Sequence, residues 1–102
     1  MNDGKLVRDK IPQIIEAAGK KPIIHILSEE EYLQELDKKL MEEVAEYQED
    51  KSLEELADIL EVLYAICEAR GHSVEELMAV KEKKKEDRGG FAERIFWSGN
   101  ER

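Results

Sequence analysis

Two clusters of carboxylates in this chain have the spacing of a cation site. Glu42-Glu43-x-x-Glu46 is followed further along the chain by Glu55-x-x-Asp58. Residues three apart lie on one face of a helix, so carboxylates within each cluster are neighbours. Carboxylates this close repel one another unless a cation neutralises them, and oxygen ligands on rigid helices suit Mg²⁺ or Mn²⁺, which serve phosphate chemistry. The alternative is a solvated acidic surface, which a chain with 40% charged residues produces readily.

The residues around Asp58 favour the cation site. Between Leu56 and Cys67, Asp58 and Glu61 are the only charged residues. A helix that is apolar nearly all round is buried in a bundle or between subunits. An ionised carboxylate there is costly unless it is paired or bound to a metal. Asp58 is therefore a candidate site residue, and Glu61, one turn further on, either extends the site or pairs with a lysine.

Serine and glycine residues mark the ends of the predicted helices. Ser-x-x-Glu begins three of them, at Ser28, Ser52 and Ser73, and this pattern is typical of a capping box. Gly19 and Gly71 are typical of helix ends. The fold class is therefore all-α, with residues 1–102 as a single domain. We expect helices at residues 11–18, 28–49, 52–70 and 73–86.

The two central helices should run antiparallel, because only a very short connection joins them. This hairpin brings the turn of Glu43 and Glu46 close to the turn of Glu55 and Asp58, since both lie near the same loop. Glu55 also has a competing role. As the third residue after Ser52 it is placed to cap its own helix, and its spacing leaves both roles open.

The second helix of the hairpin carries apolar residues on two opposite sides. Leucines form a stripe along one side, whereas Ile59 and Val62 lie on the other. One neighbouring helix cannot cover both sides, so we expect a homo-oligomer, most simply a two-fold dimer. The dimer would complete a four-helix-type bundle. A chain of 102 residues buries only a modest core alone, which favours the same arrangement.

Two short segments, residues 21–27 and 94–97, are the only strand candidates. Both are rich in isoleucine or aromatic residues, and they could pair with each other, including across subunits. The fold therefore has, at most, short strand-like segments near its two ends.

Charge and cysteine content restrict the function classes. A formal net charge of −9 argues against binding to a nucleic-acid polymer, which requires a basic face. The single Cys67 excludes an internal disulfide and is expected to be inert packing. No apolar stretch reaches the roughly 18 residues of a membrane span, and no signal peptide is recognisable. We therefore expect a cytoplasmic protein with no membrane partner.

Two basic sets are candidates for binding the phosphates of a ligand. Lys5, Arg8 and Lys10 form a compact set near the N-terminus. Lys84 and Arg88 precede a Gly-Gly pair that fits a turn in which backbone N–H groups and a guanidinium meet phosphate oxygens. The two sets could straddle a triphosphate. The alternative for the second set is a solvated helix end, where cations complement the helix dipole.

With these residues assembled, the chain resembles the MazG-like, all-α nucleotide pyrophosphohydrolases. That superfamily also holds phosphoribosyl-ATP pyrophosphohydrolases and dimeric dUTPases. The resemblance rests on E-E-x-x-E followed by E-x-x-D, and on the opening Lys-Leu-Val-Arg-Asp-Lys-Ile-Pro and the closing Arg-Gly-Gly-Phe. It covers nearly the whole chain and indicates a short single-domain branch.

The resemblance implies a helical bundle that completes its core as a dimer or tetramer. It implies Mg²⁺ held by Glu43, Glu46, Glu55 and Asp58, which favours the ligand role of Glu55 over the cap. The implied reaction, of a house-cleaning type, hydrolyses the α–β phosphoanhydride of a nucleoside triphosphate to a monophosphate and pyrophosphate. Glu42 and Glu43 are the candidate catalytic residues, with Glu42 as the hypothetical general base.

Other functions are compatible with the same sequence. The substrate could be phosphoribosyl-ATP, or the chain could be a non-catalytic helical dimer that binds nucleotide or serves as an adaptor. The hairpin loop is short where some relatives carry longer insertions for base recognition. The sequence therefore predicts neither the base nor the sugar of the substrate.

Overall fold

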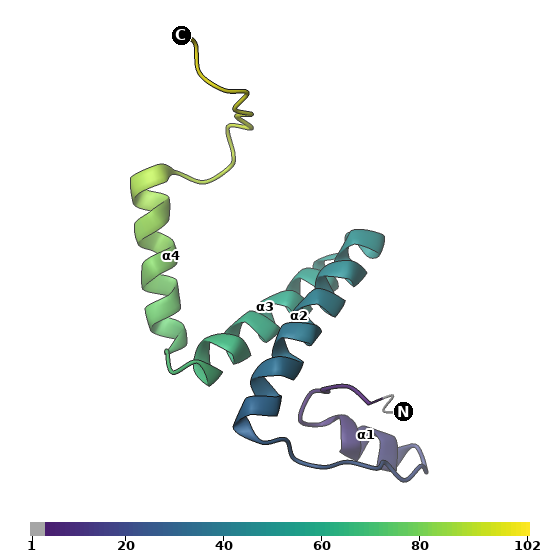
Figure 1. Ribbon diagram of the computed structural model, residues 1–102. Coiled ribbons are helices and arrows are strands. Elements are labelled where there is room, and N and C mark those ends of the chain that lie inside the picture. The colour runs from purple at the N-terminus through teal and green to yellow at the C-terminus, as the bar shows by residue number, and fades with distance from the viewer. Residues whose placement is uncertain (1–3) are drawn as a thin grey trace.

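The computed structural model describes residues 4–102 and contains four α-helices (Figure 1). No strand occurs among these residues, so the all-α prediction is confirmed. Each helix begins and ends within about two residues of its predicted bounds. None of the helices in this part of the chain has the length and apolar character that crossing a membrane requires. The helices are α1 (Ile11–Ala17), α2 (Glu29–Asp50), α3 (Leu53–Ala69) and α4 (Val74–Arg88).

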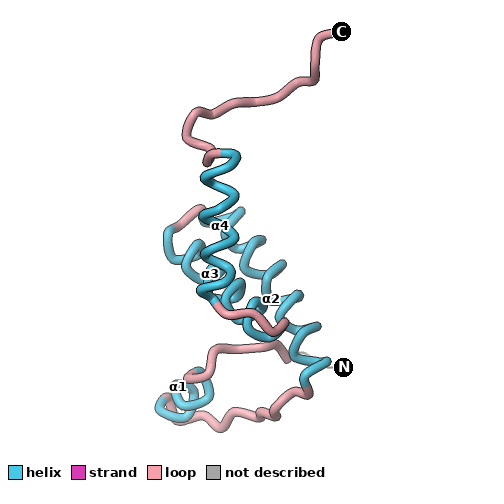
Figure 2. The backbone as a smooth tube through the Cα atoms, turned by 90° about the vertical axis from the view of Figure 1, so that its left-hand side faces the viewer, coloured by secondary structure: helices cyan, strands magenta, loops and turns pink. Residues whose placement is uncertain are grey.

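The centre of the fold is an antiparallel hairpin of α2 and α3, which lie side by side along their length (Figures 1 and 2). Lys51 ends α2 in the left-handed conformation, with φ of 55°, and its N–H donates to the carbonyl of Tyr47 at 2.7 Å. Only Lys51 and Ser52 separate the two helices, so α3 folds straight back along α2. The predicted hairpin is thereby confirmed.

Few side chains are buried within one chain. Leu36 of α2 is 3% exposed and Val62 of α3 is 8% exposed, and these are the buried apolar residues in the described part of the molecule. The face of α3 that carries Val62 lies toward α2. Its opposite face carries a row of exposed leucines, here called the leucine stripe, which consists of Leu53, Leu56, Leu60 and Leu63.

The other two helices project from the hairpin (Figure 1). The first turns of α4 contact α3 and include the half-buried Leu77 and Met78, whereas α4 is exposed from Ala79 onwards. Within residues 4–102, α1 packs against no other helix. One chain therefore contains the four expected helices, but only α2 and α3 pack against each other along their length.

The single chain is much more open than a compact protein of its size. Its accessible surface is 9573 Å², whereas a compact folded protein of 11.8 kDa exposes about 5,900 Å². Its radius of gyration is 18.2 Å, compared with about 13 Å for a compact domain of this length. The excess surface, roughly 3,700 Å², is larger than the total surface buried in a standard protein–protein interface.

The two strand candidates are loops in this structure. Residues 21–27 belong to the connection between α1 and α2, and residues 94–97 lie in the C-terminal arm, defined here as residues 89–102. Figure 2 shows both as loops at opposite ends of the molecule. They do not pair with each other within one chain.

Candidate metal and phosphate site

The hairpin brings five acidic residues of two helices together. One oxygen from each of Glu42, Glu43 and Glu46 lies within 4.8 Å of the other two. The same holds for one oxygen from each of Glu43, Glu55 and Asp58. Glu43 belongs to both groups and therefore joins them. We call these five residues the acidic cluster.

Glu43 is the buried member of the acidic cluster. It is 7% exposed, and its Oε2 atom, like Oε2 of Glu55, is buried without a hydrogen-bond partner in the described chain. Burial raises the pKa of Glu43, and the charge of Glu46 raises it further against the opposing charge of Lys39. Burial also raises the pKa of Glu55, together with the charges of Glu46 and Asp58. Both carboxylates are thus costly in their ionised form, a cost that a bound cation would relieve.

The helix caps show that the Glu55 side chain is not used locally. α2 and α4 begin with complete capping boxes, in which the carboxylate of the glutamate accepts the backbone N–H of the serine. At the start of α3, the Ser52 hydroxyl accepts the N–H of Glu55 at 3.2 Å, but the Glu55 carboxylate does not return to Ser52. It lies beside Glu43 and Asp58 instead. The sequence left open whether the Glu55 carboxylate caps α3 or joins the other acids. In the structure it lies in the acidic cluster.

Two cations of the N-terminal segment reach the acidic cluster. A guanidinium nitrogen of Arg8 donates to Oδ1 of Asp58 at 2.7 Å. The ammonium of Lys5 donates to Oε1 of Glu42 at 3.2 Å. These long-range ion pairs attach the segment before α1 to the hairpin. They also place two predicted phosphate-binding residues at the acids.

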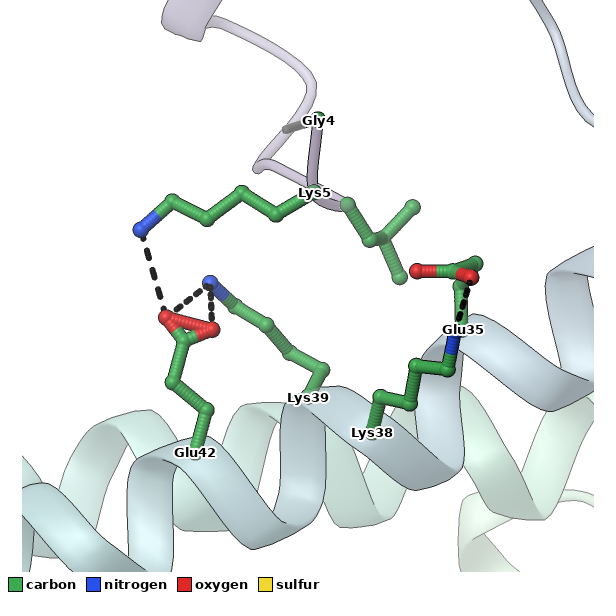
Figure 3. A pocket seen from close by; sticks show the side chains of 7 residues that line it. Gly4, Lys5, Glu35, Lys38, Lys39 and Glu42 are labelled. Carbon is green, nitrogen blue, oxygen red and sulfur yellow. Dashed lines mark hydrogen bonds and ion pairs between the residues drawn. The ribbon is translucent and has the colours of Figure 1, made fainter. Parts of the chain in front are cut away.

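Lys39 is a further member of the site that the sequence reasoning missed. Its ammonium lies 3.4 Å from Oε2 of Glu42 and 3.7 Å from Oε1 of Glu43. Figure 3 shows Lys5 and Lys39 both pointing toward the Glu42 carboxylate. Burial raises the pKa of Glu42, but its hydrogen bonds to these lysines and their charges outweigh burial, so the pKa is lowered overall. The available signal was the spacing, because Lys39 precedes Glu42 and Glu43 at helical ion-pair distances.

An open cavity of about 260 Å³ lies beside this group (Figure 3). Lys5, Lys38 and Lys39 line it together with Glu35 and Glu42. Lys38 pairs with Glu35 at 3.1 Å, so the cavity wall alternates in charge. An anionic group in this cavity would lie directly next to the acidic cluster.

The remaining candidate residues lie elsewhere. Lys10 is exposed at the N-cap of α1, and Glu61 is exposed on α3 outside both groups of acids. Lys84 and Arg88 lie on the exposed half of α4, which begins at the end of α3 far from the acidic cluster and diverges from the hairpin (Figure 1). The N-terminal basic set and the basic set of α4 therefore do not meet at the acids within one chain, because α4 contacts α3 only through its first turns.

The donor set fits a hard divalent cation. The acidic cluster offers only carboxylate oxygens, held on two packed helices, and Mg²⁺ and Mn²⁺ prefer such ligands. The unpartnered buried oxygens of Glu43 and Glu55 are the atoms that most need a cation. Oδ1 of Asp58 is already paired with Arg8, so a metal ion at Asp58 would compete with this internal partner for the carboxylate.

Comparisons with known proteins give a match of limited extent. An uncharacterized protein of Mycolicibacterium smegmatis (strain ATCC 700084 / mc(2)155) is 57% identical to this chain over 42 residues. These residues are 41% of this chain and 43% of the relative, so the match spans less than half of either protein. No protein-family model and no solved structure matches the chain.

Replacing Glu55 by glutamine should stabilise the metal-free protein at neutral pH. The folded-state pKa of Glu55 lies above its ordinary value of 4.5, so the ionised carboxylate lowers stability at pH values above the folded pKa. The advantage of Glu55→Gln should therefore shrink as the pH falls through that pKa and disappear below 4.5. Thermal unfolding in a chelator at several pH values measures this, with the neighbouring exposed Glu54→Gln as the control. A Glu55→Gln protein that melts below wild type at neutral pH would contradict the expected repulsion.

Proposed function

We propose that this protein is a Mg²⁺-dependent nucleoside triphosphate pyrophosphohydrolase of the MazG-like all-α type. The observation that carries the proposal is the position of Glu55. Its carboxylate does not make the cap bond that Glu31 makes in α2 and Glu76 makes in α4. It lies beside Glu43 and Asp58 instead, and its Oε2 atom is buried without a hydrogen-bond partner in the described chain. A further acid beside the buried Glu43 raises the cost of the fold unless a cation is bound there. The proposed reaction comes from the resemblance of the two-part carboxylate motif to that family. It would cleave the α–β phosphoanhydride and release pyrophosphate.

In this proposal the acids of the two helices have different roles. Glu43, Glu46, Glu55 and Asp58 hold Mg²⁺, or Mn²⁺, with the buried Glu43 at the centre. When bound, the metal stabilises the negative charge that develops on the phosphate oxygens. Glu42 is the proposed proton acceptor for the attacking water. Its lowered pKa keeps it ionised at neutral pH, as a base must be, although it also makes it a weaker one.

The N-terminal cations are proposed to bind the outer phosphates. Lys5 and Arg8 approach the acidic cluster from one segment, and both side chains are more than half exposed, so they can turn toward a ligand at little cost. A metal bound at Asp58 would neutralise the Asp58 carboxylate in place of Arg8. The Arg8 guanidinium would then be available for a bidentate contact with phosphate. Lys84 and Arg88 would have to come from a second copy of the chain, since the exposed half of α4 that carries them contacts no part of α2.

We also propose that two copies assemble about the leucine stripe, as a dimer or as a tetramer of two dimers. Four leucines along one helix face are exposed in a single chain, and the excess surface exceeds what a standard interface buries. A second hairpin packed on this face would complete a four-helix core. The interface would be largely apolar, as in obligate oligomers.

The proposed site predicts that metal binding and phosphate binding can be separated by mutation. Glu43→Gln should weaken Mg²⁺ binding by at least about tenfold and abolish turnover, because it removes the central ligand. Arg88→Ala should leave Mg²⁺ affinity unchanged but reduce transition-state stabilisation by about 1.5–3 kcal/mol, the contribution of a hydrogen bond to a charged group. Calorimetry with Mg²⁺ and pyrophosphate release from a panel of nucleoside triphosphates measure both.

The matched control for Glu43→Gln is Glu49→Gln, an exposed acid later on α2. Normal Mg²⁺ affinity in Glu43→Gln would refute the metal site. The other candidate functions give their own outcomes: a phosphoribosyl-ATP pyrophosphohydrolase would release pyrophosphate only from that substrate, and an adaptor would bind no Mg²⁺ at all.

Arg8→Gln should increase the affinity of the nucleotide-free protein for Mg²⁺ while it slows turnover. The substitution removes the internal cation that competes for Asp58, and an exposed ion pair of this kind corresponds to a change of about two- to fivefold. Turnover should fall because the guanidinium no longer contacts phosphate. Arg70→Gln, which affects a distant pair with Asp37, is the control for both measurements. Weaker Mg²⁺ binding in Arg8→Gln would show that Arg8 supports the metal instead of competing with it.

The proposed assembly predicts that the protein sediments as a dimer or tetramer at micromolar concentration. Leu60→Lys should shift it toward monomer and reduce its thermal stability, because a charge would enter an apolar interface. Glu61→Lys, which adds positive charge at the next position on another face of α3, should remain assembled. Sedimentation velocity distinguishes these cases. A stable and fully helical wild-type monomer would rule the assembly out.

A further inference from the structure

Two apolar loop segments are left uncovered by the part of the chain that the structure describes. In the loop between α1 and α2, Ile23 and Ile26 are almost fully exposed and Ile24 is more than half exposed. In the C-terminal arm, Phe96 is almost fully exposed and Trp97 is 75% exposed. Large apolar side chains grouped at this level of exposure usually mark an interaction site.

The backbone of both segments is also unpaired. Among the described residues, neither residues 21–27 nor residues 95–100 make a backbone hydrogen bond to another part of the chain. Both segments are rich in isoleucine and aromatic residues, which favour strands. An extended segment with free N–H and C=O groups and apolar side chains is suited to pairing with another such segment.

The two segments cannot meet within one molecule. They lie at opposite ends of its 64 Å long axis, with the loop near α1 and the arm beyond the far end of α4 (Figures 1 and 2). Their pairing therefore requires two copies. The arm begins at Gly89, with φ of +83°, followed by Gly90, so its direction relative to α4 is set by residues with wide conformational freedom.

We propose that the C-terminal arm of one copy docks in extended form along residues 21–27 of a second copy. Backbone hydrogen bonds would hold the two segments together, while isoleucines of the loop cover Phe96 and Trp97. The contact would account for exposed surface that the leucine stripe does not include. It requires the second copy that we have proposed, but it does not depend on any catalytic activity.

Trp97 makes the contact measurable, because it is the one tryptophan of the chain. In the assembled wild-type protein, its emission should be blue-shifted and protected from acrylamide. Ile24→Pro removes a backbone donor from the loop and should expose Trp97, with its emission shifted to that of the unfolded chain. The control Ile24→Val keeps both the N–H and a branched side chain and should behave as wild type. Far-UV circular dichroism checks that the helices are retained.

A mixing experiment shows whether the contact is between copies. The full-length Trp97→Phe protein gives no tryptophan signal but has an intact loop, whereas the Ile24→Pro protein has an intact arm. An excess of Trp97→Phe protein should restore the blue shift and the protection of Trp97 in the Ile24→Pro protein. Three outcomes would overturn the proposal: an exposed Trp97 in assembled wild type, a buried Trp97 in Ile24→Pro alone, or no recovery on mixing. A buried Trp97 in Ile24→Pro alone would place the arm on another surface, such as the leucine stripe.

Discussion

The mutual repulsion of carboxylates around Glu43 is the constraint on which the rest of this structure depends. Glu43 is buried between two helices whose shared apolar core is small, and it lies beside acids of both helices. Two cations of the same chain partly neutralise these acids. Lys39 of the same helix pairs with Glu43, and Arg8, from a segment far away in sequence, pairs with Asp58. Ion pairs at these acids therefore help to hold the N-terminal segment against the hairpin, whereas its helix packs against no other described helix.

Much of this fold was predictable from local signals. Serine N-caps predicted three of the four helices and the short loop predicted the hairpin, because both signals depend on neighbours in sequence. The juxtaposition of Glu43 with Glu55 followed from the hairpin alone. Whether the Glu55 carboxylate caps its helix or joins the acidic cluster could not be predicted from the sequence. The same Ser-x-x-Glu pattern gives closed capping boxes in α2 and α4. The difference lies in what faces each helix start, which only tertiary structure shows.

The residues that sequence reasoning placed least well depend on long-range geometry. Arg8 was expected near phosphate and is found on Asp58, because the anion nearest to it in the folded chain is a carboxylate. Arg88 was expected with the other cations, but α4 carries few apolar residues past its first turns and so has little to hold it against the hairpin. Lys39 was overlooked because a lysine at ion-pair spacing from glutamates is common on charged helices and does not by itself mark a site.

The hairpin of α2 and α3 also bears on the order of events as the chain folds. Its contacts join helices that are adjacent in sequence, so closing it costs little chain entropy and should be fast. Encounter between copies is bimolecular, and its rate depends on concentration. The carboxylates are thus gathered by a rapid local step, while the outer leucines still face water. In the proposed assembly, a dilute nascent population would pass through a stage in which the acidic cluster is already formed but the leucine stripe is not yet covered.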